Sequence, residues 1–207
     1  MRRWLGVDVG ASRKGFDVAL VDDTCLLAVR SGLDRAAVVE LVEEARPTLV
    51  AIDSPRSCAP DGETARADEL ELNRRICSIR WTPDVANVFG NPYYAWITEG
   101  LALFDALMAR GVEAIEVFPT ASWTRWLGKR GSHSRASWSR LGLQILALDG
   151  VPERTSQDQR DAIAAAVTAR QHSRGETERI GEIVVPSGGM RRPAIKSAVP
   201  ASVVTLA

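Results

Sequence analysis

The sequence predicts an α/β domain built around a mixed β-sheet of about five strands, in the order β-β-β-α-β-α-β-α, with flanking helices. Three short apolar segments separated by turn residues indicate a meander at the N-terminus. These segments are residues 4–9, 15–21 and 25–30. A helix and a fourth apolar segment, residues 48–53, follow. Because a strand–helix–strand crossover places its two strands in parallel, the expected sheet is mixed.

The helices are predicted from caps, apolar periodicity and stop signals. Asp34 is a favourable N-cap for the first helix, apolar residues recur at helical spacing from Val38 to Ala45, and Pro47 ends the pattern. Four later helices are expected near residues 93–110, 120–127, 137–148 and 157–172. The fifth strand is expected at 112–118, and residues 182–186 are a candidate late strand.

The chain is interpreted as one domain over residues 1–186. Residues 54–92 contain a proline-rich loop, a charged helix near 64–76 and an irregular stretch, so this segment is predicted to be an insertion or lid. Glycine and proline interrupt the sequence after Pro186, and residues 187–207 are predicted to form a mobile tail.

Composition excludes several classes of protein. The 26 basic and 26 acidic residues cancel, so any nucleic-acid surface has to be local. Three cysteines and two histidines lack the spacing of a disulfide framework or a zinc finger, which favours a reducing, cytoplasmic setting. The apolar stretch at the N-terminus is too short for the hydrophobic region of a signal peptide, and no apolar run reaches the roughly 18 residues of a membrane span.

Acidic residues stand inside or at the end of three predicted strands. Asp8 lies in the first strand, Asp53 ends the fourth and Glu116 lies in the fifth. Parallel neighbours bring their carboxyl ends to one edge of the sheet, where open α/β sheets bind ligands, so Asp8 and Asp53 are expected to be neighbours. A glutamate in an apolar strand is costly without a partner, so Glu116 is expected either to join them or to form an ion pair with Arg125 or another basic group.

Two further carboxylates open the helix predicted at 157–172. Ser156 and Gln159 match a capping box, which places Asp158 in the first turn and Asp161 three residues on, along the same helix face. Asp158 has a simpler interpretation as a favourable charge at a helix N-terminus. The alanine-rich sequence after Asp161 is small enough for the helix to pack closely on the sheet.

These carboxylates predict a divalent metal site. Oxygen ligands without a histidine cluster favour Mg²⁺ or Mn²⁺. Two such ions about 3.5–4 Å apart activate a water and stabilise the leaving oxygen of a phosphodiester, so the pattern is that of a nuclease site. The candidate metal ligands are Asp8, Asp53, Glu116, Asp158 and Asp161, and all of them except Asp158 are also candidate catalytic residues.

Several motifs together resemble the domain-of-unknown-function 429 family, which is described as predicted nucleases with an RNase H-like fold. The motifs are Gly6-Val-Asp-Val-Gly10 followed by Gly15, Ala51-Ile-Asp-Ser-Pro55, Glu116-Val-Phe-Pro119 and Asp158-Gln-Arg-Asp-Ala-Ile-Ala-Ala-Ala. The resemblance covers about residues 3–186 and implies metal-ligand roles for Asp8, Asp53 and Asp161, with Glu116 or Asp158 in support. The sequence departs from the expected pattern at Phe118, where a histidine is expected.

A basic segment suggests the substrate. Residues 117–148 contain five basic residues and no acidic residue, with three tryptophans interleaved. Phosphate neutralisation and base stacking would use such a segment, whereas the alternative places the tryptophans in the core and the arginines in solvent. The exposed loop 128–134 is its most promising part. The candidate nucleic-acid-binding residues are Arg125, Trp126, Lys129, Arg130 and Arg135.

The sequence therefore predicts metal-dependent phosphodiester hydrolysis, by a nuclease acting on DNA or RNA. A non-catalytic module that binds nucleic acid or protein, and a hydrolase of small phosphoesters, are the alternatives. Dinucleotide and P-loop motifs are absent from the sequence, and 207 residues are too few for the two domains of a sugar-kinase-like or actin-like ATPase. Ion-dependent activity that Asp8→Asn abolishes would distinguish the enzyme from the binding module.

Overall fold

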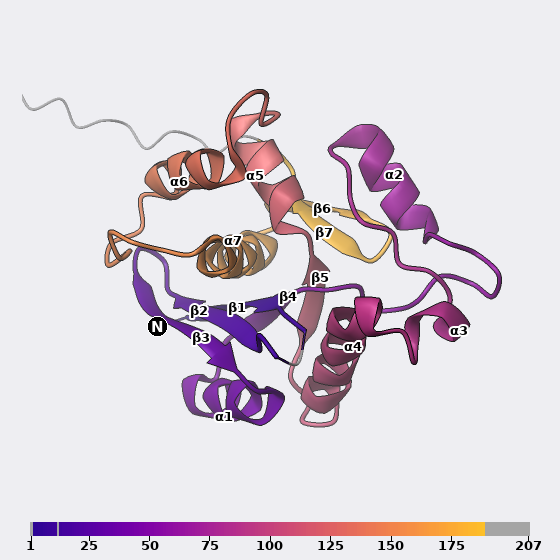
Figure 1. The fold of residues 1–207 in the computed structure, drawn as a ribbon. Helices are drawn as coiled ribbons and strands as arrows, with labels where there is room; N and C mark the ends of the chain where they lie inside the picture. Colours follow the sequence, from indigo (N-terminus) through magenta and orange to yellow (C-terminus); the bar gives the residue numbers. More distant parts are fainter. Residues whose placement is uncertain (1, 12, 189–207) are drawn as a thin grey trace, which may run out of the picture.

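A seven-stranded mixed sheet forms the centre of the computed structural model, which describes residues 2–11 and 13–188 (Figure 1). The strands lie in the order β3-β2-β1-β4-β5-β7-β6. The first three strands are antiparallel, β1, β4, β5 and β7 are parallel to one another, and β6 returns antiparallel to β7. The strands are β1 (Trp4–Val9), β2 (Phe16–Val21), β3 (Leu26–Leu33), β4 (Leu49–Asp53), β5 (Ala114–Val117), β6 (Thr177–Ile180) and β7 (Ile183–Pro186).

Helices cover both faces of this sheet. On one face lie α5, α6 and α7, and on the other lie α1 and α4, as Figure 1 shows. The segment between β4 and α4 adds α2, α3 and the short 3₁₀ helix η1 beyond the β5 side. The helices are α1 (Arg35–Ala45), α2 (Ala67–Arg75), α3 (Val85–Val88), η1 (Pro92–Tyr94), α4 (Ala95–Met108), α5 (Pro119–Leu127), α6 (Arg135–Leu146) and α7 (Gln157–His172).

The close approach of α7 to the centre of the sheet depends on small residues. Gly6 of β1 faces α7, and a Cβ atom at this position would lie 2.2 Å from the carbonyl oxygen of Ala162 and from the amide nitrogen of Ala166. Alanine on the helix and glycine on the strand therefore allow backbone to approach backbone. The residue two positions after Gly6 on the same face is Asp8, so this packing brings the start of α7 close to Asp8.

The architecture confirms the expected fold class. The first five strands form an antiparallel meander followed by parallel crossovers, in the order β3-β2-β1-β4-β5, which is the RNase H-like arrangement. Asp34 caps α1 by accepting a hydrogen bond from the Ala37 amide at 2.8 Å, and Ser156 and Gln159 form the expected capping box of α7. The sheet is larger than expected because β6 and β7 form a hairpin along β5.

Residues 54–92 pack on the sheet through one buried helix face. Leu72 and Ile76 pack against Ile180 and Ile183 of the β6–β7 hairpin. The sequence did not predict this contact. Most of the segment predicted to be a mobile tail, residues 189–207, lies outside the described residues. In the part of the chain that is described, no helix combines the length and the apolar character that a membrane crossing requires.

Candidate metal centre and cleft

Asp8 and Asp53 lie side by side at the carboxyl ends of the two central parallel strands. The register of β1 and β4 pairs them directly. Both side chains point to the face that α7 covers, because their alternate neighbours Gly6 and Ala51 contact that face. The predicted pairing of these two strand ends is therefore present in the structure.

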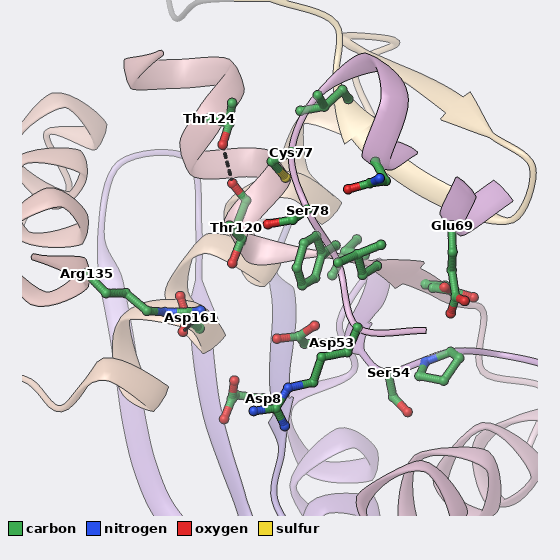
Figure 2. A pocket seen from close by; sticks show the side chains of 18 of the residues that line it. Asp8, Asp53, Ser54, Glu69, Cys77, Ser78, Thr120, Thr124, Arg135 and Asp161 are labelled. Carbon is green, nitrogen blue, oxygen red and sulfur yellow. Dashed lines mark hydrogen bonds and ion pairs between the residues drawn. The ribbon is translucent and has the colours of Figure 1, made fainter. Parts of the chain in front are cut away.

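The start of α7 adds Asp158 and Asp161 to the same side of the sheet. Figure 2 shows Asp161 on the same side as Asp8 and Asp53. Asp161 is 2% exposed and accepts hydrogen bonds from the Trp123 indole at 2.9 Å, from Arg135 Nη2 at 2.8 Å and from the amide of Gln157. Asp158 forms an ion pair with Lys14, whose Nζ lies 2.7 Å from its Oδ2. Each of these helix carboxylates therefore already has a cationic partner from another segment.

Asp17 completes the group and is not among the site residues predicted from the sequence. It lies directly opposite Asp8 in the antiparallel register of β1 and β2, is 4% exposed and accepts a hydrogen bond from the Ser31 hydroxyl. Carboxylate oxygens of Asp8, Asp17 and Asp158 lie within 4.8 Å of one another. A carboxylate inside an apolar strand was the available signal, but placing it beside Asp8 requires the register of the hairpin.

Burial and mutual repulsion disfavour the ionised form of the central carboxylates. Burial, followed by the charges of Asp161 and Asp158, raises the pKa of Asp8 to about 7, while Lys14 acts in the opposite direction. Burial and the same kind of repulsion, from Asp8 and Asp161, raise the pKa of Asp53 well above its usual range against the opposing effect of Arg135. The group therefore has more negative charge than its surroundings compensate.

The donor set fits a hard divalent cation. Five carboxylates face this region, and two cations, Lys14 and Arg135, form ion pairs with them in the described part of the chain. All donors are oxygen, the chemistry that Mg²⁺ and Mn²⁺ prefer. Asp8 would be the central ligand, with Asp53 on one side and Asp17 and Asp158 on the other. Asp161 would serve as a ligand only after an oxygen atom is released by Arg135 or Gln157.

Glu116 lies on the other face of the sheet. Its neighbours Ile115 and Val117 pack toward α7, so the Glu116 side chain points away from Asp8 and Asp53. Arg66 binds both of its carboxylate oxygens, with Nη1 at 2.8 Å from Oε2, and the Arg56 amide donates to Oε2 at 2.8 Å. Glu116 therefore lies outside the metal group. Its contacts match the alternative expected from the sequence, a buried ion pair, and the partner is Arg66 and not Arg125.

A cleft of about 1000 Å³ opens over the carboxylates. One wall is the segment 76–82 that follows α2, and the other is the start of α6 with the loop before it. Lys129, Arg130 and Arg80 line the cleft, are exposed, and form no ion pair among the described residues. Unpaired positive charge therefore stands on both walls.

The basic segment 117–148 divides into a buried part and an exposed part. Trp126 is 7% exposed, packs edge-on against Trp123 and donates its indole N–H to Gln171, so it is a core residue. Arg125 forms an ion pair with Glu178, and Arg135 with Asp161. Of the predicted nucleic-acid contacts, Lys129 and Arg130 are the two that the structure leaves free in the cleft.

Two solved structures of Thermus thermophilus RuvC are similar to this chain. One is RuvC in complex with a Holliday junction substrate, at 18% identity and a TM-score of 0.49, and the other is RuvC alone, at 19% identity and a TM-score of 0.47. Each alignment covers 84% of this chain and 96% of the RuvC chain. No curated protein matches the sequence.

The family described as proteins of unknown function, DUF429, matches residues 6–184. The match begins in β1, two residues before Asp8, and ends in β7, so it contains every carboxylate of the candidate metal centre. Because it covers most of the chain, the protein belongs to the DUF429 family.

Proposed function

We propose that the protein is a metal-dependent phosphodiesterase that cleaves nucleic acid. The observation that supports this proposal is the convergence of Asp8, Asp53 and Asp161 on one side of the sheet, at the carboxyl ends of the central parallel strands. Carboxylates that burial and repulsion hold at raised pKa values, in a cleft, are typical of functional sites. A structural role alone would favour paired or apolar side chains at Asp8 and Asp53, which have no closer cation than Lys14 at 4.0 Å from Asp8 in the ion pairs of the described residues.

In this proposal Asp8 and Asp53 hold Mg²⁺ or Mn²⁺, and Asp17 and Asp158 complete the oxygen donors. The ion would supply acidification of a bound water and stabilisation of charge on the leaving oxygen. Trp123 and Gln157 orient the Asp161 carboxylate, whose position beside the cleft suits it to support an ion or a water. The alanine face of α7 keeps these carboxylates close to the strand ends.

Nucleic acid is the proposed substrate because the cleft has, on opposite walls, cations that form no ion pair among the described residues. Lys129 and Arg130 on one side and Arg80 on the other are placed to contact backbone phosphates on either side of the carboxylates. Trp81 follows Arg80 and is 48% exposed, but it does not line the cleft, so the proposal of nucleic acid rests on the cations.

A cleavage panel tests the proposal. Single-stranded, duplex, hybrid and branched oligonucleotides are incubated with the protein in Mg²⁺, in Mn²⁺ and in EDTA. We expect cleavage that needs the metal and that Asp8→Asn reduces to background. Asp105→Asn is the matched control, because Asp105 is exposed on α4, away from the cleft.

The same panel distinguishes the alternatives. Binding of nucleic acid that is independent of metal and of Asp8, without cleavage, would indicate a binding module. Hydrolysis of bis(p-nitrophenyl) phosphate without cleavage of any oligonucleotide would indicate a hydrolase of small phosphoesters. Either result would contradict the proposal of a nuclease.

A further inference from the structure

Lys14 places an ammonium group inside the acidic cluster. Its Nζ lies 2.7 Å from Asp158 Oδ2 and 4.0 Å from Asp8 Oδ2. It comes from the turn between β1 and β2, in which the Lys14 amide donates to the Ala11 carbonyl at 2.7 Å and Gly15 adopts a φ of +71°. The turn thus fixes the backbone of Lys14 beside two of the proposed metal ligands.

The position of Lys14 conflicts with metal binding at the same carboxylates. Oxygens of Asp8, Asp17 and Asp158 lie within 4.8 Å of one another, so a divalent ion held by Asp8 and Asp158 would stand next to the ammonium. Like charges at such a distance repel, and the ion offers the carboxylates the stronger attraction. The Lys14 side chain is 49% exposed and lines the cleft, so it has room to leave Asp158.

A released Lys14 would have a partner in the substrate. Lysine carries three donors on a long flexible stem and binds phosphate as a point charge. Lys14 stands at the edge of the cleft beside Asp8, where the proposed reaction places the phosphate that is cleaved. Lys129 and Arg130 line the same cleft without a carboxylate partner among the described residues, so their role does not involve this exchange.

We infer that Lys14 is a counter-cation that exchanges with the metal: it offsets part of the charge of Asp8 and Asp158 in the metal-free protein, and once metal binds it moves to a phosphate oxygen. This inference rests on the proposed function. It predicts opposite effects of one substitution on two affinities, because removing Lys14 removes a competitor of the metal and a ligand of the phosphate.

Titration calorimetry on the full chain tests the inference without measuring activity. We expect Lys14→Gln to bind Mn²⁺ about five-fold more tightly than the wild type, the effect of removing one partly screened charge, and to bind inorganic phosphate at saturating Mn²⁺ about five-fold more weakly. Lys14→Arg should keep both wild-type affinities. Lys129→Gln removes the same charge from the same cleft and should leave the Mn²⁺ affinity unchanged.

Unchanged or weaker Mn²⁺ binding by Lys14→Gln, or unchanged phosphate binding, would overturn the inference. Asp8→Asn separates this failure from that of the proposed function: if Asp8→Asn binds Mn²⁺ as the wild type does, the metal site itself is wrong. If Lys14→Gln does not fold, chemical acetylation of the wild type tests the exchange instead, with the extent of acetylation at each lysine measured by mass spectrometry. Mn²⁺ should increase the reactivity of Lys14 relative to Lys129, and no increase would contradict the exchange.

Discussion

Two groups of buried carboxylates lie at the same edge of the sheet, on opposite faces, and they differ in how their charge is compensated. Glu116 is 4% exposed, and Arg66 binds both of its oxygens while a backbone amide adds a third donor. Asp8 is 8% exposed and has one distant cation, Lys14 at 4.0 Å, with acidic residues on several sides. Burial raises the pKa of both Glu116 and Asp8 to about 7. At Glu116 the Arg66 guanidinium and the Arg56 amide oppose this rise in pKa, whereas at Asp8 the charges of Asp161 and Asp158 add to it. The first group therefore has its hydrogen-bonding partners within the protein, and the second is surrounded by like charge.

A buried acid without close cationic partners is therefore a better candidate for function than one whose partners lie within the protein. The Arg66 network also holds the cleft wall, because Glu69 of α2 accepts hydrogen bonds from the amides of Arg66 and Thr82 and from the Thr82 hydroxyl. It connects α2, β5 and the segment 76–82 and leaves little for a ligand to add. The Asp8 group leaves unbalanced charge beside an open cleft, which a cation would stabilise.

Asp161→Asn should have the largest effect on activity and little effect on stability. Asparagine retains an acceptor for the Trp123 indole, and the lost ion partner Arg135 is 45% exposed and can be solvated. We expect activity at background and a change in unfolding free energy within about 1 kcal/mol. Thermal melts with EDTA and with excess Mg²⁺ should show a metal-dependent rise for the wild type that the variant mostly loses. A variant that melts much lower in both buffers would place Asp161 with the structural acids.

Glu116→Gln should have the largest effect on stability. It leaves Arg66 buried without its strongest partner, and breaking a buried ion pair costs about 3–5 kcal/mol. Urea unfolding of the wild type and the variant measures this cost. The double variant Arg66→Met with Glu116→Met is the control and should recover part of the loss, since it removes both charges while Glu69, which also pairs with Arg66, keeps the hydrogen bonds donated by the backbone amide at position 66 and by Thr82. Full stability of Glu116→Gln combined with loss of Mn²⁺ binding would instead assign Glu116 to the metal site.

The metal-free protein should lose stability as the pH rises through about 7. Burial and the neighbouring acids raise the pKa of Asp8 from 3.8 to about 7, so the folded state holds a proton that the unfolded state releases. The stabilisation is complete below pH 3.8 and declines toward the folded pKa, by up to about 1.4 kcal/mol per pH unit for one proton.

Urea unfolding in EDTA between pH 5 and pH 8 checks this dependence. Asp8→Asn should reduce the slope, because asparagine does not titrate, and the raised pKa values of Asp53 and Glu116 should keep the remainder. Mn²⁺ affinity should change in the opposite direction and increase with pH, since the ion requires deprotonated carboxylates. Equal pH slopes for the wild type and Asp8→Asn would contradict the raised pKa of Asp8.

The smallest expected effect concerns the cleft walls. Lys129→Ala with Arg130→Ala should lower the slope of log affinity against log salt by up to about 1.8 for duplex DNA, weakening binding for all sequences alike. Arg154→Ala, an exposed arginine outside the cleft, is the control and should leave the slope unchanged. An unchanged slope for the double variant would mean that these side chains are solvated and do not contact phosphate.

Local patterns in the sequence were sufficient for much of this fold. The strands predicted at residues 4–9 and 48–53 contained Asp8 and ended at Asp53, and the crossover between them made the two parallel neighbours. The capping box at Ser156 set the start of α7 and with it Asp158 and Asp161. These features depend on residues close together in the chain, which is why periodicity and caps reveal them.

Which acids lie together depends on contacts between segments that are far apart in the sequence. Strand alternation shows that Glu116 and Ile115 point oppositely, but apolar helices cover both faces of the sheet, so the pattern does not say which face α7 covers. Asp17 joins Asp8 through the register of the hairpin, and Arg66 reaches Glu116 across 50 residues of chain. Trp126 looked like a stacking residue and is buried, because its environment comes from α7 and not from its neighbours in sequence.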